Sequence, residues 1–315
     1  MSRAMKPSAT WVITEDLAGL QAQAVGLAEA AGLAYATKVF RPKGIWRHVP
    51  AALWPSPRAA VGAAVVAPPF PELLIGAGGK AAALLASLRR SVRGVIVQHP
   101  RLPLGRFDLV VAARHDGIAG PNVIVTRTAL HRVSPARLAE AERVWTPRLA
   151  HLPRPLVSVL VGGANGRYRL DAAVAGQLAA QLAAMMQRDR VGLALTPSRR
   201  TGAEVREALR AALAPRGGFV WDGEGENPYF GLLACADAIV VTADSVSMIS
   251  EAAATRAPVL IAQLPGRSQR QGAFLQGLID DGRVRLYQGR FDQWPVAPLD
   301  DTAEAAAEMC RRFGY

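Results

Sequence analysis

The sequence predicts an α/β protein built from two similar domains, each a parallel sheet covered by helices. In both halves of the chain, short β-branched runs alternate with alanine-rich segments of helical composition. Residues 146–155 carry three prolines and interrupt this alternation, and the pattern restarts at residue 156 with a new apolar strand. We therefore expect two Rossmann-like domains that face each other across a cleft.

The length of the chain indicates its number of domains, and its charge indicates the kind of partner it binds. A chain of 315 residues is long enough for two domains of ordinary size, and half of its residues are hydrophobic. Lys and Arg number 37 against 25 Asp and Glu, a formal charge of +12, which indicates an anionic partner such as a phosphate-bearing ligand or an acidic membrane surface. No polybasic run or nucleic-acid-binding signature accompanies this charge, so we expect no nucleic-acid partner.

The cysteines and the apolar segments indicate a compartment. Cys235 and Cys310 are the only cysteines, and neither has the spacing of a metal site, which favours a reducing environment. The sequence has no signal-peptide core and no apolar run of membrane-spanning length. We expect a cytoplasmic protein, with peripheral contact to the inner face of the cytoplasmic membrane if an anionic surface is its partner.

The first half begins with a strand, a polar turn and a helix, which is how open α/β domains start. The expected strands are residues 11–14, 34–40, 73–75, 92–98, 107–112 and 122–126, and the expected helices are 20–31, 80–90 and 134–145. A glycine turn precedes the second helix, but Ala81 follows Lys80, so the GK[ST] ending of a Walker loop is missing.

Residues 41–57 are irregular and contain Trp46, His48, Trp54 and several prolines. Two interpretations stay open for this loop. An exposed loop rich in tryptophan and arginine suits a membrane interface, whereas tryptophans packed back onto the domain are purely structural.

Polar residues follow several first-half strands, where they face the ligand crevice of an open parallel sheet. The candidate catalytic residues at these positions are Asp16, His99, His115 and Asp116. Asp16 is the first choice for a general base, since the turn after the first strand commonly faces the donor in such folds. His115 and Asp116 have a structural alternative, a turn closed through Gly117.

The second half repeats the pattern. The expected strands are residues 156–161, 191–195, 218–221, 239–241, 259–262 and 286–287, and the expected helices are 170–187, 229–236, 245–255, 271–281 and 302–313. Residues 238–264 form a βαβ unit in which polar side chains cluster at the helix start, where unpaired backbone N–H groups and the helix dipole favour phosphate.

These features predict a nucleotide site in the second half. A glycine turn follows one strand, and two arginines flanked by hydroxyls follow the next and suit a diphosphate clamp. Glu251 lies nearly two turns into the 245–255 helix, where it suits a ribose diol, although an N-cap serine with a solvated glutamate is the simpler alternative. The nucleotide-binding candidates are Gly162, Gly163, Asn165, Ser198, Arg199, Arg200, Asn227, Asp244, Ser245, Ser247 and Glu251.

Three segments carry a family resemblance: NPYFGLLACADAIVVTADSVSMISEAAATRAPVLI at 227–261, TPSRRT at 196–201 and VGGANGRYRLD at 161–171. They resemble the elongated-mitochondria, or mitochondrial fission, family, and the likeness extends over most of the chain. Bacterial members of that family resemble two-domain GT-B glycosyltransferases. The resemblance implies an acceptor domain at 1–150, a donor domain at 151–298 and a C-terminal helix, 299–315, that crosses back to the first domain.

The resemblance implies a glycosyltransferase that uses a nucleotide-sugar and an envelope or lipid-linked acceptor. No DxD-like pair stands in a suitable context, so we expect no metal ion and no cofactor beyond the donor. A catalytically silent adaptor is the first alternative, because the turn after the first strand lacks the histidine of the family pattern. A nucleotide-sugar 2-epimerase, which also uses two such domains, is the second.

Overall fold

The computed structural model describes residues 9–315, which fold as two compact units. Unit 1 contains the chain up to residue 132 together with residues 300–315, and unit 2 contains residues 133–299. Each unit is an α/β domain with one six-stranded sheet in which every strand pairing is parallel, as the sequence predicted.

Unit 1 is organised around the strand order β2-β1-β3-β4-β5-β6. The strands are β1 (Thr10–Glu15), β2 (Tyr35–Phe40), β3 (Leu73–Ala77), β4 (Arg93–Val97), β5 (Leu109–Ala113) and β6 (Val123–Thr126). The chain runs outward from β1 to β2 and then returns to the other side through β3. The junction between β1 and β3 is therefore a topological switch point, where open α/β sheets bind ligands.

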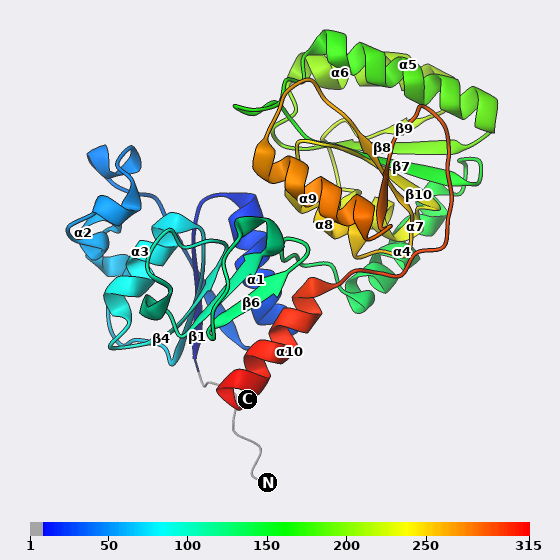
Figure 1. Ribbon diagram of the computed structural model, residues 1–315. Coiled ribbons are helices and arrows are strands. Elements are labelled where there is room, and N and C mark those ends of the chain that lie inside the picture. Colours follow the sequence, from blue (N-terminus) through cyan, green and yellow to red (C-terminus); the bar gives the residue numbers. More distant parts are fainter. Residues whose placement is uncertain (1–8) are drawn as a thin grey trace. The chain divides into compact units, whose positions relative to one another are not determined.

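Helices cover both faces of this sheet. They are α1 (Ala18–Ala30), α2 (Pro57–Val61), α3 (Gly79–Leu88) and α10 (Asp301–Phe313), with 3₁₀ turns η1 (Gly44–Arg47), η2 (Ala51–Leu53), η3 (Ala63–Val66), η4 (Leu104–Arg106) and η5 (Arg114–Asp116). Alternate residues along each strand face opposite ways, so Val12 packs towards α1 and α10 while Ile13 packs towards α2 and α3. Figure 1 shows α1 and α10 on one face of this sheet and α2 and α3 on the other.

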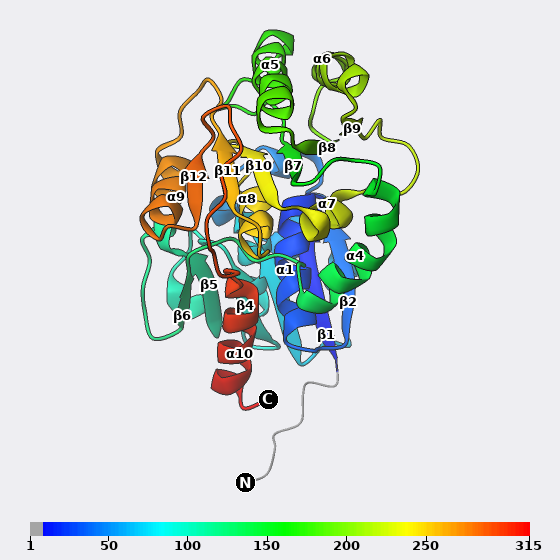
Figure 2. The same ribbon diagram turned by 90° about the vertical axis from the view of Figure 1, so that its right-hand side faces the viewer.

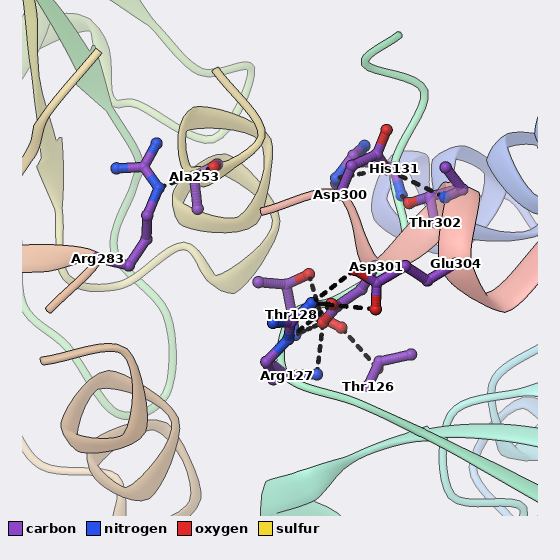
Figure 3. A network of polar contacts seen from close by, with 11 residues as sticks. Thr126, Arg127, Thr128, His131, Ala253, Arg283, Asp300, Asp301, Thr302 and Glu304 are labelled. Atoms are coloured by element: carbon purple, nitrogen blue, oxygen red, sulfur yellow. Dashed lines mark hydrogen bonds and ion pairs between the residues drawn. The ribbon is translucent and has the colours of Figure 1, made fainter. Parts of the chain in front are cut away.

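The C-terminal helix α10 is fixed to unit 1 by the Asp301 carboxylate (Figure 3). Asp301 is buried and accepts hydrogen bonds from the Thr128 backbone N–H at 2.7 Å and from the Arg127 guanidinium at 2.9 Å. The Thr302 hydroxyl accepts the His131 backbone N–H at 3.0 Å. Ala305, together with other small residues of α10, then packs against the core of unit 1. The helix expected to cross back to the first domain thus belongs to unit 1.

Unit 2 has the strand order β12-β11-β10-β7-β8-β9. The strands are β7 (Leu156–Val161), β8 (Gly192–Pro197), β9 (Phe219–Val220), β10 (Ala238–Thr242), β11 (Val259–Ala262) and β12 (Val284–Leu286). The chain progresses from β7 to β9 on one side and then continues through β10 on the other. Its switch point therefore lies between β7 and β10.

The helices of unit 2 also lie on both faces (Figure 2). They are α4 (Pro135–Leu149), α5 (Ala172–Asp189), α6 (Ala203–Leu213), α7 (Tyr229–Cys235), α8 (Val246–Ala253) and α9 (Gln269–Asp280), with the 3₁₀ turn η6 (Ala214–Arg216). Helices α5 and α6 pack on one face, and α4, α7, α8 and α9 pack on the other. The central βαβ unit predicted from residues 238–264 is β10, α8 and β11.

The predicted domain boundary at residue 150 was too late, because α4 belongs to unit 2. Trp145 of α4 is buried against Leu156 and Leu232, and an added Cβ on Gly231 would meet its ring at 2.1 Å. Residues 146–149 of the proline-rich stretch belong to α4, which runs past the predicted end at residue 145 with Pro147 inside it, and residues 150–155 connect α4 to β7 inside unit 2. The units part at residues 132 and 133 instead.

The loop tryptophans of unit 1 are packed rather than exposed. Trp54 is buried, and its indole N–H donates to the Val49 carbonyl at 3.1 Å, while Trp46 packs against the core on the α3 side. The tryptophans therefore pack on the domain, and contact of this loop with a membrane stays a prediction. Across residues 9–315, none of the helices combines the length and the apolar character needed to cross a bilayer.

Candidate functional site

The switch point of unit 2 brings two of the predicted segments together. Gly162 and Gly163 follow β7, and Asp244 and Ser245 follow β10, its neighbour in the sheet. The Gly162 N–H donates to the Thr242 hydroxyl at 2.8 Å, and the Gly163 N–H donates to Asp244 at 2.9 Å. The glycine turn and the start of α8 therefore adjoin at one end of the sheet, and we call this place the crevice because open α/β sheets bind their ligands there.

Both glycines are required by close approach. A Cβ on Gly162 would stand 2.2 Å from a carboxylate oxygen of Asp244, and one on Gly163 would stand 2.5 Å from the Arg200 carbonyl carbon. Non-bonded contacts this short do not occur at a Cβ atom, so any larger residue would push the turn out of place. The glycine signal in the sequence thus reflects a steric need at this crevice.

Asp244 connects the segments around the crevice through its buried carboxylate. Its side chain is fully buried and accepts from the Gly163 N–H, from the Thr242 hydroxyl at 2.7 Å and from the Arg200 guanidinium at 3.2 Å. A buried carboxylate repels phosphate unless a cation neutralises it, and Arg200 supplies that cation. This geometry gives Asp244 a supporting role for the turn, and a direct ligand contact for Asp244 stays a prediction.

The two predicted arginines have different surroundings in the structure. Arg200 donates to the Gly163 carbonyl at 3.1 Å, yet its side chain remains 48% exposed. A guanidinium has five N–H donors, and two are used here, so others remain for a ligand. Arg199 is exposed and has no ion-pair partner among residues 9–315. Arg200 is thus the arginine placed to contact a ligand in the crevice.

Local hydroxyl contacts hold Arg200 in place. The Ser198 hydroxyl accepts the Arg200 backbone N–H at 3.2 Å and lies 3.1 Å from the Thr201 hydroxyl. Thr201 in turn donates to the Gly162 carbonyl. Ser198 therefore shapes the turn after β8, and Thr201 joins that turn to the glycine turn after β7.

The start of α8 has the predicted cap. The Ser245 hydroxyl accepts the Met248 backbone N–H at 3.4 Å, and Ser247, in the first turn, is half-buried. The first N–H groups of a helix have no partner within the helix, and they carry the positive end of its dipole. This end of α8 opens at the same switch point as Gly163, an arrangement that favours an anion.

Glu251 is positioned by a tyrosine that sequence reasoning missed. The Tyr229 hydroxyl at the start of α7 donates to the Glu251 carboxylate, which is half-buried. Burial raises the pKa of Glu251 to about 7, although the hydrogen bond from Tyr229 lowers it. Burial and the nearby carboxylate also raise the pKa of Tyr229 well above its ordinary value. No local sequence pattern links the two residues, because they come from different helices.

Two predicted nucleotide-binding residues, Asn165 and Asn227, already accept hydrogen bonds within their own turns. The Asn165 side-chain oxygen accepts from the backbone N–H groups of Arg167 and Tyr168 at 2.9 and 3.0 Å. The Asn227 side-chain oxygen accepts the Tyr229 N–H at 2.9 Å, where α7 begins. Both asparagines stabilise loops near the crevice, and a direct ligand contact for either stays a prediction.

Unit 1 places Asp16 at its own switch point, beside Glu15 and Lys80. The Lys80 ammonium lies 2.9 Å from Glu15, and the Arg41 guanidinium forms an ion pair with Asp16. Glu15 and Lys80 were not predicted as site residues; Glu15 is the last residue of β1, and Lys80 lies in the first turn of α3.

The other catalytic candidates follow β4 and β5. The His99 Nδ1 accepts the Arg101 backbone N–H at 2.9 Å, so a neutral His99 carries its proton on Nε2. A role for His99 as the base stays a prediction. His115 and Asp116 lie in η5, which closes through Gly117 in the left-handed conformation at φ 66°. That closure is the structural turn named as the alternative. Residues 9–315 contain no cluster of His, Cys, Asp and Glu able to hold a metal ion.

Comparison with known proteins gives a family. The family model described as Mitochondrial fission ELM1 matches residues 18–313. The Mitochondrial fission protein ELM1 of Arabidopsis thaliana is 34% identical over 274 residues, which cover 77% of this chain. The aligned part spans 64% of the Arabidopsis protein, so the chain covers less than two thirds of that relative's length.

Solved structures confirm the predicted fold class. A UDP-GlcNAc 2-epimerase of Neisseria meningitidis, bound to UDP-GlcNAc, aligns with 96% of this chain and 100% of its own at a TM-score of 0.56 and 10% identity. A UDP-glucosyltransferase of Polygonum tinctorium aligns with 99% of this chain and 89% of its own at a TM-score of 0.53 and 12% identity. At such identities the likeness shows the fold alone, that of GT-B glycosyltransferases and epimerases.

Proposed function

Because this chain belongs to the Mitochondrial fission ELM1 family and has a GT-B-like fold, we propose that it is a glycosyltransferase. In this proposal a nucleotide-sugar binds to unit 2, and unit 1 binds an envelope or lipid-linked acceptor. No metal ion or other cofactor takes part. One observation carries the proposal: the switch point of unit 2 combines a glycine turn, an arginine with spare donors and the N-terminal end of α8.

The donor's diphosphate lies in this crevice, with Arg200 on its oxygens and the start of α8 beside it. Glu251 accepts hydrogen bonds from the ribose, and the loop at 222–228 brackets the base. Trp221, whose indole N–H donates to the Glu224 carbonyl at 2.8 Å, holds that loop in shape. The donor is thus bound by groups that also stabilise negative charge, which is the charge that develops when a nucleoside diphosphate leaves.

The transfer forms a bond between the acceptor oxygen and the anomeric carbon and breaks the bond from that carbon to the diphosphate. Arg200 and the α8 dipole stabilise the leaving diphosphate, and in an inverting reaction a base of unit 1 takes the acceptor proton. Asp16 is the first choice for this base. The Arg41 ion pair must loosen for Asp16 to act, which makes this assignment directly testable.

Isothermal titration with the nucleoside diphosphates of each common base tests the donor half. We expect one of them to bind, and Arg200→Met to weaken that binding by about 1–3 kcal/mol, since the phosphate loses a charged hydrogen bond. The neighbouring Arg199→Met variant is the matched control and should keep its affinity. Silence from every nucleotide, or equal losses in both variants, would count against the proposed donor site.

A transfer assay tests the base. Asp16→Asn should lose about two orders of magnitude or more in turnover while nucleotide affinity is kept, and Asp116→Asn should stay close to the wild type. If both variants retain turnover, the carboxylate base is wrong, and His99 and His115 are the next candidates.

Two other functions have an observation in their favour. An epimerase is favoured by the structural likeness to UDP-GlcNAc 2-epimerase, and it would form an epimer without any acceptor. A catalytically silent adaptor is favoured by the family name and by the Arg41 ion pair that occupies Asp16. Product analysis without acceptor identifies an epimerase, and nucleotide binding without turnover on any acceptor points to the adaptor.

A further inference from the structure

Apart from Arg41, residues 41–58 of unit 1 have no role in the proposed function, and they form a largely exposed segment. The segment follows β2, contains η1 and η2, and reaches α2, with η2 and α2 packed against α3 (Figure 1). Ile45 is 68% exposed and Leu53 is 69% exposed. No other large hydrophobic side chain in residues 9–315 is as exposed as these two.

The exposed aliphatic side chains stand on an ordered base. Trp54 is buried, and its indole N–H donates a hydrogen bond to the Val49 carbonyl. Trp46, the residue after Ile45, packs onto the core. The Lys80 ammonium contacts the Arg47 carbonyl at 3.4 Å, which ties η1 to the start of α3. The segment therefore presents Ile45 and Leu53 outward while its aromatic rings anchor it.

The surroundings of these side chains are basic. Residues 39–71 contain four basic residues, Arg41, Lys43, Arg47 and Arg58, and no aspartate or glutamate. Asp16 offsets the charge of Arg41. Lys43 and Arg47 are exposed and have no carboxylate partner among the described residues. Exposed aliphatic groups flanked by cations without carboxylate partners are complementary to an anionic lipid bilayer, which has an apolar interior and negatively charged headgroups.

We propose that residues 41–58 dock on an anionic lipid bilayer, with Ile45 and Leu53 inserted at the headgroup boundary and Lys43 and Arg47 against the lipid phosphates. This inference goes beyond the proposed function and does not depend on it, because docking needs neither a nucleotide nor an acceptor. The ion pair from Arg41 joins the segment to Asp16. Docking would therefore hold the edge of unit 1 that carries Asp16 close to the membrane.

Sedimentation of the full chain with lipid vesicles tests this proposal. We expect binding to vesicles of phosphatidylcholine mixed with phosphatidylglycerol, little binding to phosphatidylcholine alone, and loss of binding at high salt. A Lys43→Glu and Arg47→Glu double variant should bind about 30-fold more weakly or worse. An Ile45→Ser and Leu53→Ser double variant should lose about tenfold or more.

Matched controls separate the segment from general charge and general exposure. Arg89→Glu with Arg90→Glu changes the net charge equally at two exposed residues after α3, and Val125→Ser with Leu286→Ser removes exposed apolar groups elsewhere. Both controls should bind like the wild type, and thermal unfolding should show that all four variants are folded. Equal binding to neutral and anionic vesicles, no binding to either, or equal losses in the controls would overturn the proposal.

Discussion

Replacing Glu251 with glutamine should change how the stability of the protein depends on pH. The carboxyl group of Glu251 lies half-buried beneath the Tyr229 hydroxyl, and burial raises its pKa from 4.5 to about 7. In the unfolded chain the same group ionises near its ordinary value. Between these two pH values the folded state holds a proton that the unfolded state has released.

The free energy of unfolding of the wild type should therefore fall as the pH rises from about 4.5 to about 7 and stay level above that range. Each pKa unit is worth about 1.4 kcal/mol, so ionising this buried carboxyl costs about 3 kcal/mol in full. Most of that cost, about 2 to 3 kcal/mol, falls between pH 5 and pH 8. The Glu251→Gln variant has no such group and lacks this part of the pH dependence.

Urea unfolding of both proteins at pH 5 and pH 8 measures the effect. Relative to the wild type, the glutamine variant should gain stability on going from pH 5 to pH 8. Glu142→Gln, at an exposed position on α4, is the control and should follow the wild type at both pH values. Parallel profiles for the wild type and Glu251→Gln would refute the argument that this carboxyl is held in a desolvated position.

Three further changes test other parts of the structure. Gly163→Ala should weaken nucleotide binding about tenfold or more in titration calorimetry, because its Cβ would meet the Arg200 backbone at 2.5 Å, whereas a Cβ at Gly166 meets nothing within 4 Å and Gly166→Ala should bind normally. Asp301→Ala should lower the free energy of unfolding by about 2–4 kcal/mol in urea titrations, since it leaves backbone N–H groups and a guanidinium without their buried acceptor. Glu251→Ala should weaken nucleotide binding by about 1–3 kcal/mol, and an unchanged affinity would remove the ribose assignment.

The fold could be predicted because short stretches of sequence indicate its strands, turns and helix caps. Short apolar runs mark β1, β7 and β10, and a serine at the right spacing marks the cap of α8. The glycine turn after β7 was also visible, since two adjacent glycines between a strand and a helix have few other uses. These signals each span a few residues, so no knowledge of the tertiary contacts was needed.

The contacts that shape the crevice were not visible in the same way. Arg200 reaches Asp244 from a different strand end, and Tyr229 reaches Glu251 from a different helix. Such pairs depend on the three-dimensional path of the chain, and a single sequence holds no local trace of them. The boundary at residue 150 failed for a related reason, because the burial of Trp145 against β7 and α7 decides where α4 belongs.

The central claim is that a nucleoside diphosphate binds in the crevice between the glycine turn and the start of α8. A crystal structure of the protein soaked with the nucleoside diphosphate that binds best in titration tests this claim most directly. We predict phosphate oxygens within hydrogen-bond distance of the Arg200 guanidinium and the first backbone N–H groups of α8, with the ribose hydroxyls against Glu251. A nucleotide bound away from this crevice, or a crevice that stays without nucleotide at saturating concentration, would contradict the account.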